Sequence, residues 1–87
     1  MLEEMIGEKV VIDLRSQYVA LGTLMRADEL YIELKNADLH DLRDTQTTRE
    51  NYVAASRMTG IKRNRKRVLI IRADVIAVSR LDDVVGE

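Results

Sequence analysis

The stretch VVIDLRSQYVALGTLM, residues 10–25, predicts two β-strands joined by a short polar turn. In its first half the apolar side chains alternate, as in a strand with one buried face, at Val10, Ile12 and Leu14. The second half, residues 18–25, is the second strand. Gly22 lies inside it, and a glycine there indicates a bend or a β-bulge where the sheet curves. The chain therefore begins its sheet with a bent antiparallel hairpin.

Four more elements are predicted around this hairpin. Leu2, Met5 and Ile6 have helical spacing before Gly7, which indicates a short helix over 2–6 that leads into the first strand at about 9–14. Three further strands are expected, over about 30–39, 67–72 and 75–79. The fourth strand contains the run Val-Leu-Ile-Ile at 68–71, which is typical of a strand buried on both faces.

The segment between the third and fourth strands, about residues 40–66, is too long for a structureless loop in a compact domain. Thr47 and Glu50 have the spacing of a helix capping box, and Gly60 fits a C-terminal stop. These signals predict a helix near 48–58. The other interpretation extends the third and fourth strands into a long hairpin. An acidic, frayed tail is expected over 82–87.

Composition places the chain among small globular domains. With 87 residues, 46% of them apolar and 33% charged, it has room for one domain, residues 1–87, and is too apolar for a disordered chain. No apolar run approaches the ~20 residues of a spanning helix, so no membrane partner is expected. The absence of cysteine excludes disulfides and fits a reducing cytoplasm. The expected fold is mainly β: a short N-terminal helix and five strongly bent antiparallel strands that close into a small barrel.

Catalysis and metal binding are not expected. His40 is the only histidine, and without cysteine a metal site would need carboxylates alone. Asp38, His40, Asp41 and Asp44 form a polar cluster without the spacing of a nucleophile and its base or of paired catalytic carboxylates. The four scattered glycines form no phosphate-binding loop. The sequence therefore predicts neither an enzyme nor a cofactor.

The charge is unevenly distributed. Residues 57–72 carry seven basic and no acidic side chains, although the net charge of the whole chain is −1. The centre of this block contains five cations: Lys62, Arg63, Arg65, Lys66 and Arg67. Because such a run repels itself, it lies in water or against an anion. One interpretation is a solvated loop, and the other is a surface in the loop before the fourth strand that binds phosphates.

Two segments resemble the motifs of the Sm and Sm-like (LSm) family. The first runs from the alternating strand at 10–14 through Gly22 and Leu24 in the bent second strand to Asp28 in the following turn. The second, residues 68–76, is an aliphatic strand followed by an arginine and a short final strand. The resemblance covers about residues 1–39 and 67–81, and the long segment between them falls where the loop before the family's fourth strand varies most.

This resemblance implies a partner and an assembly. Similar proteins form closed rings in which the fourth strand of one subunit pairs with the fifth strand of the next, and the pore binds uridine-rich or other single-stranded RNA. A homo-oligomeric ring of about five to seven copies is therefore expected. By analogy with the family, bases would be held by Asp28, Tyr31 and Arg72. Arginine stacks on a base and donates to it in a fixed fork.

The sequence departs from the family pattern at this site. Ala73 follows Arg72 where the family has glycine, and the turn after Asp28 is one residue short. With that gap after Glu29, Tyr31 takes the place of the family's base-contacting asparagine. A tyrosine there would stack on a base without discriminating between bases.

Each candidate also has a plain structural interpretation. Arg72 would be a strand-end charge paired with Asp74 or Asp28, Asp28 a turn residue, and Tyr31 a half-buried strand residue. Two functions follow. The chain is either a ring-forming module that binds single-stranded RNA in RNA processing or chaperoning, or a structural small barrel that keeps the ring without binding RNA.

Overall fold

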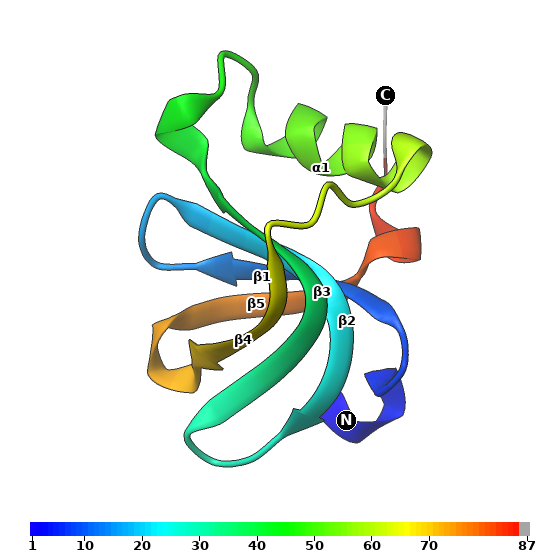
Figure 1. Ribbon diagram of the computed structural model, residues 1–87, viewed down its shortest axis with the longest axis vertical. Coiled ribbons are helices and arrows are strands. Elements are labelled where there is room, and N and C mark those ends of the chain that lie inside the picture. Colours follow the sequence, from blue (N-terminus) through cyan, green and yellow to red (C-terminus); the bar gives the residue numbers. More distant parts are fainter. Residues whose placement is uncertain (86–87) are drawn as a thin grey trace.

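A computed structural model describes residues 1–85. Within these residues, five strands form one antiparallel sheet in the order β4-β3-β2-β1-β5, and one α-helix is inserted between β3 and β4 (Figure 1). The elements are β1 (Lys9–Leu14), β2 (Tyr18–Ala27), β3 (Tyr31–Asp41), α1 (Arg49–Thr59), β4 (Arg65–Ile71) and β5 (Val75–Arg80). The predicted mainly β fold class with five antiparallel strands is confirmed. No helix within residues 1–85 is long and apolar enough to cross a membrane.

The sheet bends where β2 and β3 pass Gly22. Asn36 and Ala37 of β3 together oppose this single residue of β2, which makes a β-bulge. Asn36 has a φ of 50°, a left-handed conformation that asparagine tolerates better than most residues. A Cβ atom added to Gly22 would lie 3.1 Å from the Cβ and 3.2 Å from the Cα of Ala37. The predicted irregularity at Gly22 is confirmed, and the absence of a side chain there leaves room for the close approach of the two strands.

The main hydrophobic core lies on one face of the sheet. Its buried members come from all strands except β5: Val10, Ile12, Leu14, Ala20, Leu24, Ile32, Leu34, Ala37 and Ile70. The predicted N-terminal helix is a short 3₁₀ helix, η1 (Leu2–Met5), whose Leu2 and Met5 side chains pack against this core. Successive side chains of β1 point to opposite faces of the sheet. Val10, Ile12 and Leu14 lie in the main core, whereas Val11 lies in a second cluster on the other face.

Helix α1 covers that other face. Val53 of the helix is buried with Val11, Val19, Leu21 and Leu81 in the second cluster. The Thr48 side chain accepts a hydrogen bond from the Asn51 backbone, so the N-cap is Thr48 rather than Thr47 of the predicted capping box. Gly60 ends the helix with a φ of 99°. The helix interpretation of this segment is confirmed, and the long hairpin is wrong.

Strand β4 is not buried on both faces as predicted. Ile70 is 5% exposed, but its neighbours Leu69 and Ile71 are 57% and 61% exposed. The prediction is wrong because β4 is an edge strand and nothing within residues 1–85 covers its outer face. The strand also begins two residues earlier than expected, at Arg65. Because β4 and β5 end the strand order at opposite edges, the barrel is open between them (Figure 1).

The C-terminal segment is anchored rather than frayed where the structure describes it. Leu81 begins a 3₁₀ helix, η4 (Leu81–Asp83), and is 4% exposed in the cluster beneath α1. Arg57 of α1 donates a hydrogen bond to the carbonyl of Val84 over 3.2 Å. The predicted acidic tail began at residue 82, and its last two residues, 86 and 87, lie outside the described residues. Within the predicted tail, Val84 packs against the cluster beneath α1, whereas Val85 is 93% exposed.

Candidate nucleic-acid interface

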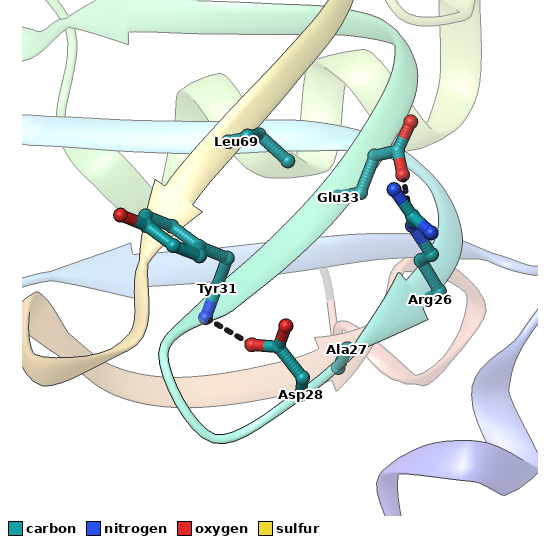
Figure 2. Close-up of a pocket in the computed structure, with 6 residues that line it drawn as sticks. All are labelled: Arg26, Ala27, Asp28, Tyr31, Glu33 and Leu69. Carbon is teal, nitrogen blue, oxygen red and sulfur yellow. Dashed lines mark hydrogen bonds and ion pairs between the residues drawn. The ribbon is translucent and has the colours of Figure 1, made fainter.

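Asp28 organises the turn between β2 and β3. Its Oδ1 atom accepts hydrogen bonds from the backbone N–H groups of Leu30 and Tyr31, each over 2.8 Å (Figure 2 shows the bond to Tyr31). Its own N–H donates to the carbonyl of Tyr31 over 2.9 Å. The N–H groups of Tyr31 and Leu30 lower the pKa of Asp28, because they stabilise the ionised carboxylate. The plain interpretation of Asp28 as a turn residue therefore holds, and the turn places Tyr31.

Arg72 joins this turn to the end of β4. It begins a short 3₁₀ helix, η3 (Arg72–Asp74), between β4 and β5. Its backbone N–H donates to the carbonyl of Leu30 over 2.8 Å, and its Nη1 donates to the carbonyl of Asp28. Within residues 1–85 it forms no ion pair with Asp28 or Asp74, so the plain interpretation as a paired charge is wrong. The guanidinium stays exposed beside the turn that holds Tyr31.

Tyr31 lines two surface hollows. Its side chain is 43% exposed, and its cross-strand neighbour on β4 is Ile71. A hollow of about 320 Å³ is lined by Tyr31, Arg72 and the residues around them: Glu29, Leu30, Ile71 and Ala73. The second, of about 240 Å³, also includes Tyr31 (Figure 2) and is lined by Arg26, Ala27, Asp28, Tyr31, Glu33 and Leu69. The three predicted base-binding residues thus come together, with an aromatic ring open to a ligand.

Glu33 is a part of this surface that the sequence patterns did not single out. Its two carboxylate oxygens accept from Arg26 over 2.6 Å and from Arg67 over 2.8 Å, which ties together β2, β3 and β4. The hydrogen bonds from Arg26 and Arg67 lower the pKa of Glu33. Side chains alternate between the two faces of a strand, so Glu33 lies on the same face of β3 as Tyr31. This alternation was the sequence signal from which Glu33 could have been predicted. The ion pair with Glu33 therefore partly neutralises the positive charge of Arg67.

The five predicted phosphate-binding cations do not form one loop. Lys62 and Arg63 lie between α1 and β4, whereas residues 65–67 are the first residues of β4. The placement of all five in a loop is wrong because the pairing of β3 with β4 extends to Arg65. All five side chains are nevertheless exposed. They lie towards the opposite end of β4 from Arg72, and at a rise of about 3.3 Å per residue Lys66 is about 20 Å from Arg72 along the strand.

The polar cluster around His40 is a packing site. The imidazole stacks on the ring of Tyr52 of α1, with centroids 3.8 Å apart and an angle of 11° between the planes. Its Nε2 atom is buried without a hydrogen-bond partner. Within residues 1–85 no three potential metal-ligating side chains come together. His40 thus helps to seat α1 on the sheet.

Comparison with known proteins relates this arrangement to solved structures. No family model matches the sequence, and no curated protein matches it. The structure is similar to an Sm protein of Pyrococcus abyssii solved in complex with a uridine heptamer, with a TM-score of 0.63 and 16% identity, over 91% of this chain and 90% of that chain. It is also similar to an Sm-like protein of Archaeoglobus fulgidus, with a TM-score of 0.62 and 13% identity over 92% and 88%. These likenesses show that the chain has the Sm-like fold.

Proposed function

We propose that this Sm-like chain assembles into a closed homo-oligomeric ring and binds single-stranded, uridine-rich RNA as a non-catalytic module of the cytoplasm. The similarity to an Sm protein solved with a uridine heptamer supports RNA as the partner. The hydrogen bond between Arg72 and the carbonyl of Asp28 carries the proposal, because it brings together two turns that are distant in sequence. Such a ring would act in RNA processing or as an RNA chaperone.

In the proposed base site the three residues have different roles. Asp28 holds the turn with a carboxylate that is engaged by backbone N–H groups. Tyr31 offers an exposed ring on which a base stacks. Arg72 offers a guanidinium that stacks on the base or donates to its edge. Tyrosine replaces the base-reading asparagine of the family pattern, so discrimination among bases would depend on Arg72.

The cations at the other end of β4 would bind phosphates. Lys62, Arg63, Arg65 and Lys66 form no ion pair within residues 1–85, whereas Arg67 is held by Glu33. Phosphate contacts release counterions and supply affinity without regard to sequence. A ring repeats both sets of contacts in every subunit, so weak single contacts add up to useful affinity.

Ring assembly is supported by the two open edges of the sheet. Aliphatic side chains on both edge strands are exposed: Leu69 by 57%, Ile71 by 61% and Ile76 by 62%. An exposed edge strand with apolar side chains pairs readily with another chain. Pairing of β4 with β5 of the next copy would satisfy both edges and, by symmetry, close a ring of about five to seven copies.

A gel-shift experiment tests the proposed function. The purified chain would be titrated against oligo(U), oligo(A) and duplex DNA at two salt concentrations. We expect the single strands to shift more strongly than the duplex, and the shift to weaken at the higher salt concentration. An assembled ring that shifts no single strand would contradict RNA binding. It would favour the alternative, a structural small barrel that keeps the ring.

A further inference from the structure

The side chain of Asn64 makes three hydrogen bonds that attach the segment between α1 and β4 to β3. Its Oδ1 atom accepts from the N–H of Leu39 over 3.0 Å, and its Nδ2 atom donates to the carbonyl of Leu39 over 3.0 Å. The carboxamide thereby pairs with β3 as a peptide group of a neighbouring strand would. The backbone N–H of Asn64 donates to the carbonyl of Ala37 over 2.8 Å. The chain is thus fixed to β3 before the regular pairing of β4 begins.

A buried carboxylate strengthens this attachment. The Nδ2 atom of Asn64 also donates to the Oδ1 atom of Asp38 over 3.2 Å, and Asp38 is only 3% exposed. A hydrogen bond to an ionised, buried acceptor is worth more than one between neutral groups, and a donor removed from it is not readily replaced by water. Asn64 therefore satisfies a polar group that would otherwise be buried without a partner.

The attachment orders two of the cations. Arg63 precedes Asn64 and donates from Nη1 to the Oδ1 atom of Asn36 over 2.6 Å, at the left-handed residue of the β3 bulge. Ile61, on the other side of Lys62, packs against the cluster beneath α1. Lys62 and Arg63 thus lie between two fixed points, although neighbouring like charges repel each other and favour disorder.

We propose that Asn64 is a positioning residue, which holds Lys62 and Arg63 along β3 as an ordered strip for RNA phosphates. The inference rests on the proposed function, since it concerns the same RNA. Its physical basis is preorganisation: a segment that is ordered before binding loses less conformational entropy when the phosphates arrive. Asn64 itself need not touch RNA, because its polar side-chain atoms are engaged by β3.

Two measurements on Asn64→Ala test the role, with Asn51→Ala, the same change on the exposed side of α1, as the control. Hydrogen exchange of the Leu39 amide should accelerate about tenfold in Asn64→Ala alone, as expected for the loss of about 1.4 kcal/mol. The affinity of the ring for oligo(U) should fall, and the salt slope should shrink by about 0.7 for each phosphate that the ring no longer neutralises. The preference for oligo(U) over oligo(A) should stay unchanged. A wild-type affinity and slope in Asn64→Ala would overturn the inference.

A double-mutant cycle separates positioning from a general loss of stability. If Asn64 acts through the two cations, Asn64→Ala should cause no further loss of RNA affinity in a chain that already carries Lys62→Ala and Arg63→Ala. An additive loss in that background would overturn the proposal.

The failure of this inference is distinguishable from the failure of the proposed function. A wild-type ring that binds neither oligonucleotide would overturn RNA binding and with it the RNA role of Asn64. A wild-type ring that binds RNA, together with an Asn64→Ala ring that binds equally well, would overturn only the positioning role. Hydrogen exchange of the Leu39 amide is measured without RNA. A wild-type exchange rate in Asn64→Ala would therefore show by itself that Asn64 does not order the segment.

Discussion

Arg72 and Asp28 show how single residues build the candidate base site. Asp28 uses its carboxylate to order the turn after β2 and offers its carbonyl to the guanidinium of Arg72. Within residues 1–85 the guanidinium of Arg72 is therefore held by one hydrogen bond, to a neutral carbonyl, and forms no ion pair with a carboxylate. A guanidinium in this state keeps its full charge and other donors for a ligand.

Replacement of this arginine tests the base site. Arg72→Ala should weaken RNA binding by about 1–3 kcal/mol per engaged base, because a stacking and hydrogen-bonding group is removed. The order of preference among oligo(U), oligo(A) and oligo(C) should change while the salt slope stays near that of the wild type. Fluorescence anisotropy would measure both, with Arg57→Ala on α1 as a charge-matched control. An assembled Arg72→Ala ring with wild-type affinity and preference would contradict the proposed site.

Asp38 is a second residue whose environment has a measurable consequence. Burial raises the pKa of its carboxyl group, because the charged form has left water. A folded-state pKa above the unfolded one means that the folded chain binds the proton more tightly. The contribution of this group to stability is therefore present at low pH and is lost as the pH rises through the folded-state pKa.

Asp38→Asn should accordingly raise the Tm at neutral pH, because a neutral amide of the same shape replaces a buried charge. The gain should shrink towards pH 3, below the ordinary aspartate pKa of about 3.9, where the wild-type carboxyl is protonated in both states. Thermal unfolding followed by circular dichroism at several pH values measures this. A lower Tm of Asp38→Asn at neutral pH would contradict this prediction. It would show that the hydrogen bond from Asn64 to the charged carboxylate stabilises the fold by more than burial of the charge destabilises it.

At the scale of elements, the bend in β2 and β3 positions the turns of the proposed base site. The bulge of Asn36 and Ala37 against Gly22 lets the strands curve around the main core. Strand β4 then follows β3, so that it ends beside the β2–β3 turn and begins beside α1. The proposed base site and the proposed phosphate strip therefore lie at opposite ends of β4.

Gly22→Ala tests the bend. The new methyl group would lie 3.1–3.2 Å from atoms of Ala37 and Leu34, so these neighbours would have to move by a few tenths of an ångström. Overpacking of this kind costs about 1–3 kcal/mol, and urea denaturation should show a lower midpoint with little change in slope. Ala55→Gly on the exposed side of α1 provides a comparison in which glycine is introduced rather than removed, with an expected cost of about 1 kcal/mol from helix propensity alone. An unchanged midpoint in Gly22→Ala would show that the strands can separate without cost.

At the scale of the whole molecule, the isolated chain is an open barrel with apolar edges. The first and last strands of the order, β4 and β5, carry the exposed Leu69, Ile71 and Ile76. A chain of this size buries only about 60–65% of its surface alone, and assembly would bury more. The ring is therefore proposed as the state in which both edges are paired.

Ile76→Lys tests the assembly. A lysine on β5 would place a charge in the proposed interface, and we expect the mass measured by light scattering to fall to that of a monomer. Met58→Lys is the matched control, because Met58 is 84% exposed on α1 and belongs to neither edge strand, so the change should leave assembly unchanged. A wild-type chain that is monomeric at micromolar concentration would contradict the ring itself. An Ile76→Lys chain that still assembles would place the interface elsewhere.

Local sequence determined the elements of this protein. The alternation in β1, the glycine in β2 and the helix signals near Gly60 act within a few residues, so strands, bend and helix were predictable. Asp28 and Arg72 were expected at the base site only because they match short motifs of the family that the sequence resembles.

Only the tertiary structure decided which surfaces the elements cover. The run at 68–71 is as apolar as a central strand, but its place at the sheet edge leaves Leu69 and Ile71 exposed. The Glu33 carboxylate meets Arg67 from a strand more than thirty residues away along the chain. Asn64 binds β3 in the same way, over a separation of 25 residues. Strand order and cross-strand partners depend on long-range packing, and a linear pattern of residue types does not encode which distant segment becomes the neighbour.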